Sequence, residues 1–287
     1  MGLLDGFEKL GLKNIEVDGM YKEEPQPTRT VEAPKIKEIP DFDEADMLFK
    51  KTYECPVCDT KYQCLTVKSN RARAIRIEKD LRPVYQDGFE PIKYEALVCP
   101  VCGYSVMSRY FQPLAPTQRK WIKDSIGVNF NVYIPDSSTI TYDEAIERIT
   151  LVLASSIVKK AKASEKAYVC LKGYWLCKSY AEAMMEDDDF DAAKLKEIKE
   201  KQDEFRTNAY EGFISARQSE TFPMGGMDES TLDYLLAEMS LELDRIDVAS
   251  KLVASILQST VAAPRMKDKA RELKEEIVEI IKRKKAE

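Results

Sequence analysis

The chain contains the same four-residue motif twice, as Cys55-Pro56-Val57-Cys58 and, 40 residues later, as Cys99-Pro100-Val101-Cys102. Two residues between two cysteines allow one turn to present both sulfurs to a metal ion. Four thiolates arranged tetrahedrally at about 2.3 Å are a usual ligand set of structural zinc. Since such a set leaves no position for water, the pattern predicts a structural rather than a catalytic zinc ion. Its predicted ligands are Cys55, Cys58, Cys99 and Cys102.

The residues that follow each motif agree with this interpretation. Gly103 and Asp59 come directly after the second cysteine of each pair, where a positive φ turns backbone N–H groups toward the sulfurs. Glycine adopts this conformation without steric cost, and aspartate tolerates it better than most residues. Two alternatives remain: iron of the rubredoxin type, which four thiolates also suit, and a redox-active dithiol. The presence of two pairs together argues against the dithiol.

The other three of the seven cysteines are not predicted to be ligands. Cys64 alternates with Tyr62 and Thr66 in an expected strand, which indicates a packed thiol. Cys170 and Cys177 are seven residues apart on an expected helix, about 10.5 Å along its axis. That separation is too large for a shared ion or a disulfide, so we expect both to be core residues.

Composition restricts the possible functions. Apolar residues make up 44 % of the chain and charged residues 33 %, and the formal net charge is −6. A generally basic, DNA-coating protein is therefore disfavoured. The chain has no histidine, which excludes Ser-His and Cys-His nucleophiles and histidine-bound catalytic zinc. A general base would have to be a carboxylate, Lys, Tyr or Cys, and no catalytic residue is predicted.

The sequence also bears on location. No segment reaches the roughly 18–20 consecutive apolar residues of a membrane span. The first residues, Met1-Gly2-Leu3-Leu4-Asp5-Gly6, lack the basic region and long apolar run of a secretory signal. We therefore expect a cytoplasmic protein with no membrane partner, in which metal binding explains the cysteine pairs better than disulfides do.

Three regions are expected along the chain. Residues 1–44 form a partly disordered tail, with a short amphipathic helix over residues 1–19 and a proline-rich linker after it. Residues 45–115 form a small β-rich module, because Lys61–Val67, Arg71–Ile77 and Lys93–Val98 are rich in β-branched and aromatic residues. Both cysteine pairs fall in this module.

Residues 116–287 are expected to be all-helical. A capping box, Thr141 with Glu144, begins the first helix, and Pro264 begins the last one. Between them the apolar spacing predicts helices over about 164–185 and 190–217 and two more before Pro264. Six helices paired as three hairpins, placed after a zinc-ribbon-like module, make an α+β fold.

Residues 47–111 resemble a bacterial family known as domain of unknown function 2225. The matching stretches are Tyr53–Cys58, Asp80–Tyr85, Pro91–Tyr94 and Cys99–Tyr104. The resemblance implies a four-cysteine metal site, a bacterial cytoplasm and a helical C-terminal companion, but no reaction. A weaker resemblance to tetratricopeptide repeats lies in the helices, carried by Leu236, Ala237, Ala249 and Val253. Asp233 and Ser240 stand where that repeat has Trp and Tyr, so an irregular bundle remains the alternative.

A basic stretch lies between the two cysteine pairs. It comprises Lys68, Arg71, Arg73, Arg76, Lys79 and Arg82. It could contact phosphates of a nucleic acid or could protect a sheet edge from pairing. The acidic total charge favours the second interpretation. The first hypothesis is thus a zinc-binding interaction or scaffold protein with a protein partner. A nucleic-acid-associated zinc ribbon using residues 68–82 is the alternative, and an enzyme is less favoured still.

Overall fold

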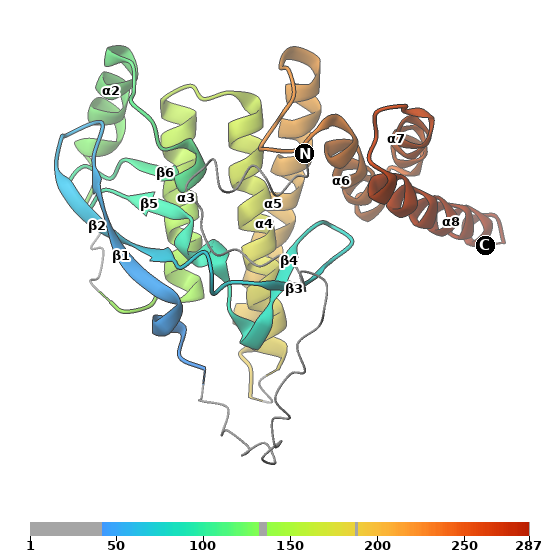
Figure 1. Ribbon diagram of the computed structural model, residues 1–287, viewed down its shortest axis with the longest axis horizontal. Coiled ribbons are helices and arrows are strands. Elements are labelled where there is room, and N and C mark those ends of the chain that lie inside the picture. Colours follow the sequence, from blue (N-terminus) through green and yellow to red (C-terminus); the bar gives the residue numbers. More distant parts are fainter. Residues whose placement is uncertain (1–41, 132–136, 187–188, 287) are drawn as a thin grey trace, which may run out of the picture. The chain divides into compact units, whose positions relative to one another are not determined.

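A computed structural model of the chain describes residues 42–131, 137–186 and 189–286. The expected N-terminal helix and nearly all of the expected linker lie outside these residues. Contacts between Cα atoms place residues 42–287 in one compact unit. Within it, a β-rich part is followed by helices, so the α+β prediction is confirmed (Figure 1).

The β-rich part consists of three separate antiparallel hairpins. The first pairs β1 (Leu48–Glu54) with β2 (Lys61–Val67), in a register that sets Tyr53 opposite Tyr62. The second pairs β3 (Ala74–Ile77) with β4 (Pro83–Tyr85), and the third pairs β5 (Ala96–Val98) with β6 (Ser105–Met107).

Two of these strands are shorter than the sequence pattern indicated. The strand expected from Arg71 begins only at Ala74, and the one expected from Lys93 begins at Ala96. Pro91–Tyr94 forms a 3-10 turn, because Pro91 favours a helical first turn and the Glu90 carboxylate accepts the N–H of Ile92.

Seven α-helices follow in the described residues. They are α2 (Pro116–Ile122), α3 (Tyr142–Val158), α4 (Ala163–Met185), α5 (Ala192–Ser219), α6 (Glu229–Glu242), α7 (Ile246–Gln258) and α8 (Pro264–Ala286). The last six are the predicted helices, whereas α2 was not predicted. The capping box at Thr141 is present, since its side chain accepts the N–H of Glu144 at 3.2 Å. None of these helices combines the length and apolarity that a membrane crossing requires.

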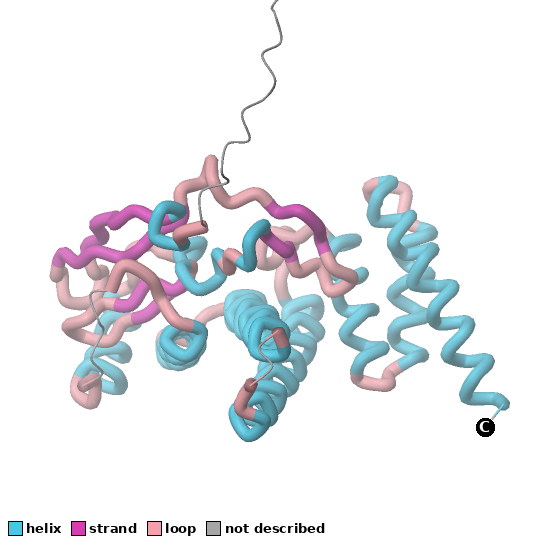
Figure 2. Tube along the Cα trace, turned by 90° about the horizontal axis from the view of Figure 1, so that it is seen from below, coloured by secondary structure: helices cyan, strands magenta, loops and turns pink. Residues whose placement is uncertain are grey.

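The helices and hairpins bury two apolar clusters. The larger is built mainly from α3 to α8 but includes residues of the β-rich part such as Leu48, Tyr94 and Met107. The smaller contains the cysteine pairs, together with Leu97, Val106 and Ile122 of α2. β5 and β6 lie against α3 (Figure 1), and the strands lie along one side of the helices when the molecule is turned (Figure 2). The domain boundary at residues 115/116 stays a prediction.

Candidate metal centre

The two cysteine motifs form matching turns between paired strands. Cys55 follows β1 and its turn leads into β2, while Cys99 follows β5 and its turn leads into β6. In the first turn Asp59 donates its N–H to the carbonyl of Cys55 at 2.9 Å, and in the second Gly103 donates to that of Cys99 at 3.0 Å. The N–H of each first cysteine also donates across its turn, from Cys55 to the carbonyl of Thr60 and from Cys99 to that of Tyr104, each at 2.9 Å. The same backbone geometry therefore occurs twice.

Positive φ angles occur at the two expected positions. Asp59 has a φ of 60° and Gly103 a φ of 69°, which confirms that expectation. Gly103 is required for a second reason, because a Cβ atom there would lie 2.3 Å from a ring carbon of Phe130. The second turn can therefore form only if residue 103 has no side chain or if Phe130 moves.

The four sulfurs converge on one point. Cys55 Sγ lies 3.6 Å from Cys102 Sγ, and Cys58 Sγ lies 3.6 Å from Cys99 Sγ. All four sulfurs lie within 4.8 Å of one another. A tetrahedral ion with ligands at about 2.3 Å requires sulfurs about 3.8 Å apart. The spacing therefore fits one tetrahedral ion, and no disulfide joins the sulfurs.

Burial and hydrogen bonding further suit the sulfurs to a metal. Cys55 and Cys99 are fully buried and Cys102 nearly so, while Cys58 is half-buried. The N–H of Val57 points at Cys55 Sγ at 3.4 Å, as expected for a turn that stabilises thiolate charge. Hydrogen bonds from Cys102 and then Cys55 lower the pKa of the Cys99 thiol to about 2. The pKa values of the Cys55 and Cys102 thiols are raised within the same cluster, so the thiolate, which is the form that binds metal, is favoured at Cys99.

Two buried tyrosine hydroxyls lie near the cluster without a hydrogen-bond partner among the described residues. They belong to Tyr62 of β2 and to Tyr104, which follows the second turn. Burial raises the pKa of both groups most. Cys64 and then Cys55 and Cys99 add to this for Tyr62, and Glu165 and then Cys55 and Cys102 do so for Tyr104. A metal with four thiolates carries a net negative charge that such hydroxyl donors would stabilise. These unpaired hydroxyl donors are consistent with a metal-bound site.

Helix α2, which was not predicted from the sequence, supports the first cysteine turn. Arg119 donates to the carboxylate of Asp59 at 2.9 Å and to the carbonyl of Val57 at 3.3 Å. Pro116, favoured at the first helical position, was the only local signal for this helix. The helix thereby anchors the first turn through residues that carry no metal-ligand pattern.

The remaining cysteines lie elsewhere. Cys64 is buried on β2 but is outside the group of four sulfurs. Cys170 and Cys177 are buried within α4, and burial raises the pKa of each thiol to about 12. Protonated thiols in an apolar setting are poor metal ligands.

The basic stretch does not form one surface. Arg82 is buried and pairs with the partly exposed carboxylates of Glu78 and Glu182, and Arg76 also pairs with Glu78. Lys79 pairs with Glu276 of α8, and Lys68 donates to the carbonyl of Asp46. Within this stretch, only the guanidinium groups of Arg71 and Arg73 have no ion pair or hydrogen bond with the part of the chain that the structure describes. Both lie before β3 rather than on it.

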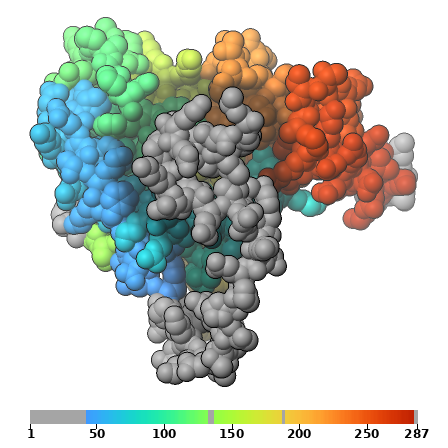
Figure 3. Space-filling model, in the orientation of Figure 1, coloured from blue at the N-terminus to red at the C-terminus, as the bar shows by residue number. Residues whose placement is uncertain are grey.

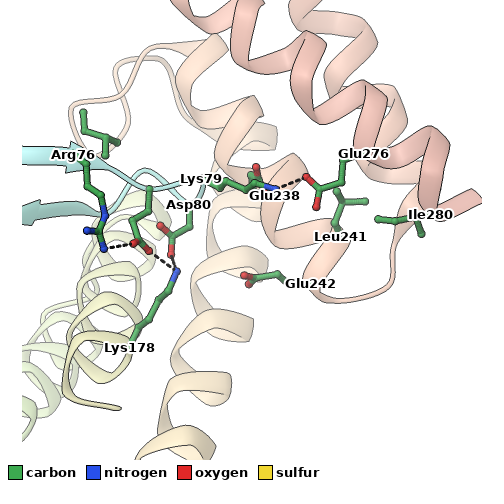
Figure 4. Close-up of a pocket in the computed structure, with 11 residues that line it drawn as sticks. Arg76, Lys79, Asp80, Lys178, Glu238, Leu241, Glu242, Glu276 and Ile280 are labelled. Atoms are coloured by element: carbon green, nitrogen blue, oxygen red, sulfur yellow. Dashed lines mark hydrogen bonds and ion pairs between the residues drawn. The ribbon is translucent and has the colours of Figure 1, made fainter. Parts of the chain in front are cut away.

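A cleft of about 670 Å³ lies between the β3–β4 hairpin and helices α4, α6 and α8 (Figure 4). Its charged groups largely compensate one another. Lys79 binds Glu276 across the cleft at 2.6 Å, and Lys178 binds Asp80 at 2.7 Å. Glu238 accepts the hydroxyl of Tyr234 at 2.8 Å. These paired charges hold the elements together. Burial, followed by the charges of Glu276 and Glu242, raises the pKa of Glu238 in the same cleft.

Comparisons with known proteins give one family. The comparison with curated proteins gave no match, and the comparison with solved structures gave none. The sequence model of one family, described as "Uncharacterized protein conserved in bacteria (DUF2225)", matches residues 48–277. The match covers both cysteine turns and all but the end of the helical region. The chain belongs to this bacterial family of uncharacterised proteins, DUF2225.

Proposed function

We propose that the chain binds one structural zinc ion through Cys55, Cys58, Cys99 and Cys102. The observation that carries this proposal is the convergence of four unlinked sulfurs at distances that suit one tetrahedral ion. Zinc is preferred to iron because a closed four-thiolate set is a usual structural zinc site. The ion would hold the first and third hairpins together without taking part in a reaction. Cysteines that bind a metal instead of forming disulfides also suit a cytoplasmic location.

The helical region is proposed to act as a scaffold for a protein partner. Helix α7 packs against both α6 and α8, and α6 also contacts α8. The red atoms of the last two helices form one region at the surface (Figure 3). Leu236, Ala237, Ala249 and Val253 are all buried there, as the tetratricopeptide-like interpretation requires. Val261, between α7 and α8, is 87 % exposed, and Val278 on α8 is 40 % exposed. Each is a single exposed apolar side chain, and the proposal takes both as points of contact with another protein.

Nucleic acid remains the second candidate, with reduced support. Four of the six basic side chains in the stretch are engaged within the protein. Two remaining arginines, Arg71 and Arg73, give at most two phosphate contacts, whose electrostatic contribution is small. A protein partner is therefore the better proposal.

Site-specific photo-crosslinking in the bacterial cell tests the scaffold proposal. A photoreactive amino acid at position 261 or 278 should capture the same protein partner. The same amino acid at Asp87, an exposed position in the turn after β4, should not capture it. Capture of nucleic acid at position 73, with no protein captured at 261 or 278, would reverse the ranking.

A further inference from the structure

Helix α3 carries a buried basic side chain, Arg148, that lacks a counter-ion. The side chain is 8 % exposed. Its guanidinium forms neither an ion pair nor a hydrogen bond with any residue that the structure describes. Proteins normally pair such largely buried charges. The guanidinium nitrogens of Arg148 are not among the fully enclosed atoms without a partner, so they face open space rather than the dry interior.

The other buried basic side chains of the described residues follow that rule. Each forms an ion pair with a carboxylate: Arg82 with Glu182 at 2.5 Å, Lys93 with Glu44 at 2.6 Å, Lys159 with Glu165 at 2.6 Å and Lys172 with Glu95 at 2.8 Å. Arg148 is therefore the exception among the described residues. This indicates that its counter-ion comes from outside the described part of the chain.

The acidic neighbour of Arg148 on the same helix, Glu144, is not its counter-ion. Glu144 lies one turn before Arg148 and acts on it electrostatically. Its carboxylate is engaged at the start of α3, where it accepts the N–H of Thr141 at 2.8 Å and the Thr141 hydroxyl at 3.1 Å. Burial lowers the pKa of Arg148, although Cys64, Glu144 and Tyr94 act in the opposite direction.

Arg148 lines a cavity of about 380 Å³ beside the second cysteine turn. The described lining also includes Lys50, Lys61 and Gln63 from β1 and β2, but no carboxylate. Leu65, Val98 and Pro100 supply apolar surface. Ligand pockets range from roughly 300 to 1,000 Å³, so the cavity has room for a small organic molecule and is larger than a single oxyanion needs.

We propose that this cavity binds a small organic anion whose phosphate or carboxylate group is held by Arg148. The planar guanidinium offers paired N–H donors that match either oxyanion. The apolar wall would contact the rest of the molecule. A nucleic-acid backbone fits less well, because a side chain that is only 8 % exposed lies below the surface that a polymer strand follows.

Thermal unfolding of the full-length, metal-containing protein tests the proposal. The protein is titrated with inorganic phosphate and, separately, with succinate, each against sodium chloride at equal ionic strength. The midpoint should rise saturably, by about 3–5 °C at ten times the Kd. The larger shift identifies the preferred head group. If neither anion exceeds chloride, or if the shift is equal in Arg148→Met, the effect is that of a salt and the proposal fails.

Two substitutions distinguish a bound anion from a carboxylate of the chain itself as the partner of Arg148. Without added anion, Arg148→Met should unfold at or above the wild-type midpoint, since the substitution removes an uncompensated charge. A lower midpoint that Asp136→Asn reproduces would assign the partner to Asp136, adjacent in sequence to Ser137 in the lining, and would overturn the proposal. If Arg148→Met does not fold, Arg148→Lys replaces it. In Arg148→Lys, the rise in unfolding midpoint caused by the anion should be smaller than in the wild type. An unchanged rise contradicts the proposal.

Discussion

The guanidinium of Arg82 joins the β3–β4 turn to α4. It donates to Glu182 at 2.5 and 2.8 Å and to the hydroxyl of Ser179 at 2.6 Å, and it pairs with Glu78 at 3.0 Å. Ser179 in turn donates to the buried carboxylate of Glu90. Leu81, which adopts a φ of 64° beside it, turns the chain so that Arg82 faces α4. Arg82 thus helps to fix the second hairpin on the helices, together with the Lys178–Asp80 and Lys79–Glu276 pairs.

Replacement of Arg82 by methionine should therefore destabilise the protein. It removes the ion pair of Glu182 and the buried one of the three basic partners of Glu78, which keeps Arg76 and Lys178. This loss should cost about 2–4 kcal/mol in the free energy of unfolding. Arg76→Met is the matched control, because Arg76 is 62 % exposed and pairs with the same Glu78; its cost should stay below about 1 kcal/mol. Urea unfolding measures the free energy of unfolding of both variants. Equal losses would show that the buried ion pairs of Arg82 contribute no more stability than the exposed pair of Arg76.

At the scale of the element, the cysteine turns were the most predictable feature. The spacing of the cysteines and the identity of Gly103 and Asp59 determine a local backbone conformation, and the structure contains it twice. The capping box at Thr141 and the proline at the start of α8 likewise marked helix starts correctly, because these signals act within one turn.

Other features depend on contacts between distant residues and were not predictable. Arg82 and Arg73 look alike in the sequence, yet one is buried and the other exposed. The difference arises from Glu182, 100 residues away. The short strands β3 and β5 and the helix α2 also lack a strong local pattern, since tertiary packing decides their extent.

Two glycines test the second cysteine turn. Both Gly103 and Gly88 have a φ of +69°, but only Gly103 is crowded, by Phe130. Alanine at either position should cost about 1–2 kcal/mol of backbone strain. Gly103→Ala should cost clearly more and weaken metal retention, because Phe130 must also be displaced. Urea unfolding and metal retention on dialysis measure the effects. Identical behaviour of the two variants would mean that the turn tolerates a side chain.

At the scale of the whole molecule, the two apolar clusters predict a stepwise response to metal removal. The cysteines belong to the smaller cluster, whereas the helices bury mainly the larger one, with Trp175, Leu236 and Val253 among its members. Removal of the metal should unfold the cysteine turns first and leave α4 to α8 helical.

Circular dichroism during chelation measures this response. The helical signal in the far ultraviolet should keep most of its amplitude after the metal is removed, while cysteine accessibility to a thiol reagent increases in the β-rich part. A single transition that abolishes the helical signal would mean that residues 42–287 fold as one unit and that the proposed boundary at 115/116 is wrong.

The metal content of the purified chain tests the central claim most directly. Protein expressed with sufficient metal should contain one zinc ion per chain by elemental analysis, and Cys99→Ser should lose it. Cys64→Ser should keep it, since Cys64 lies outside the group of four sulfurs. Iron in place of zinc would retain the site but contradict its proposed occupant. A wild-type chain with neither metal, or the loss of metal in Cys64→Ser, would contradict the four-cysteine centre itself.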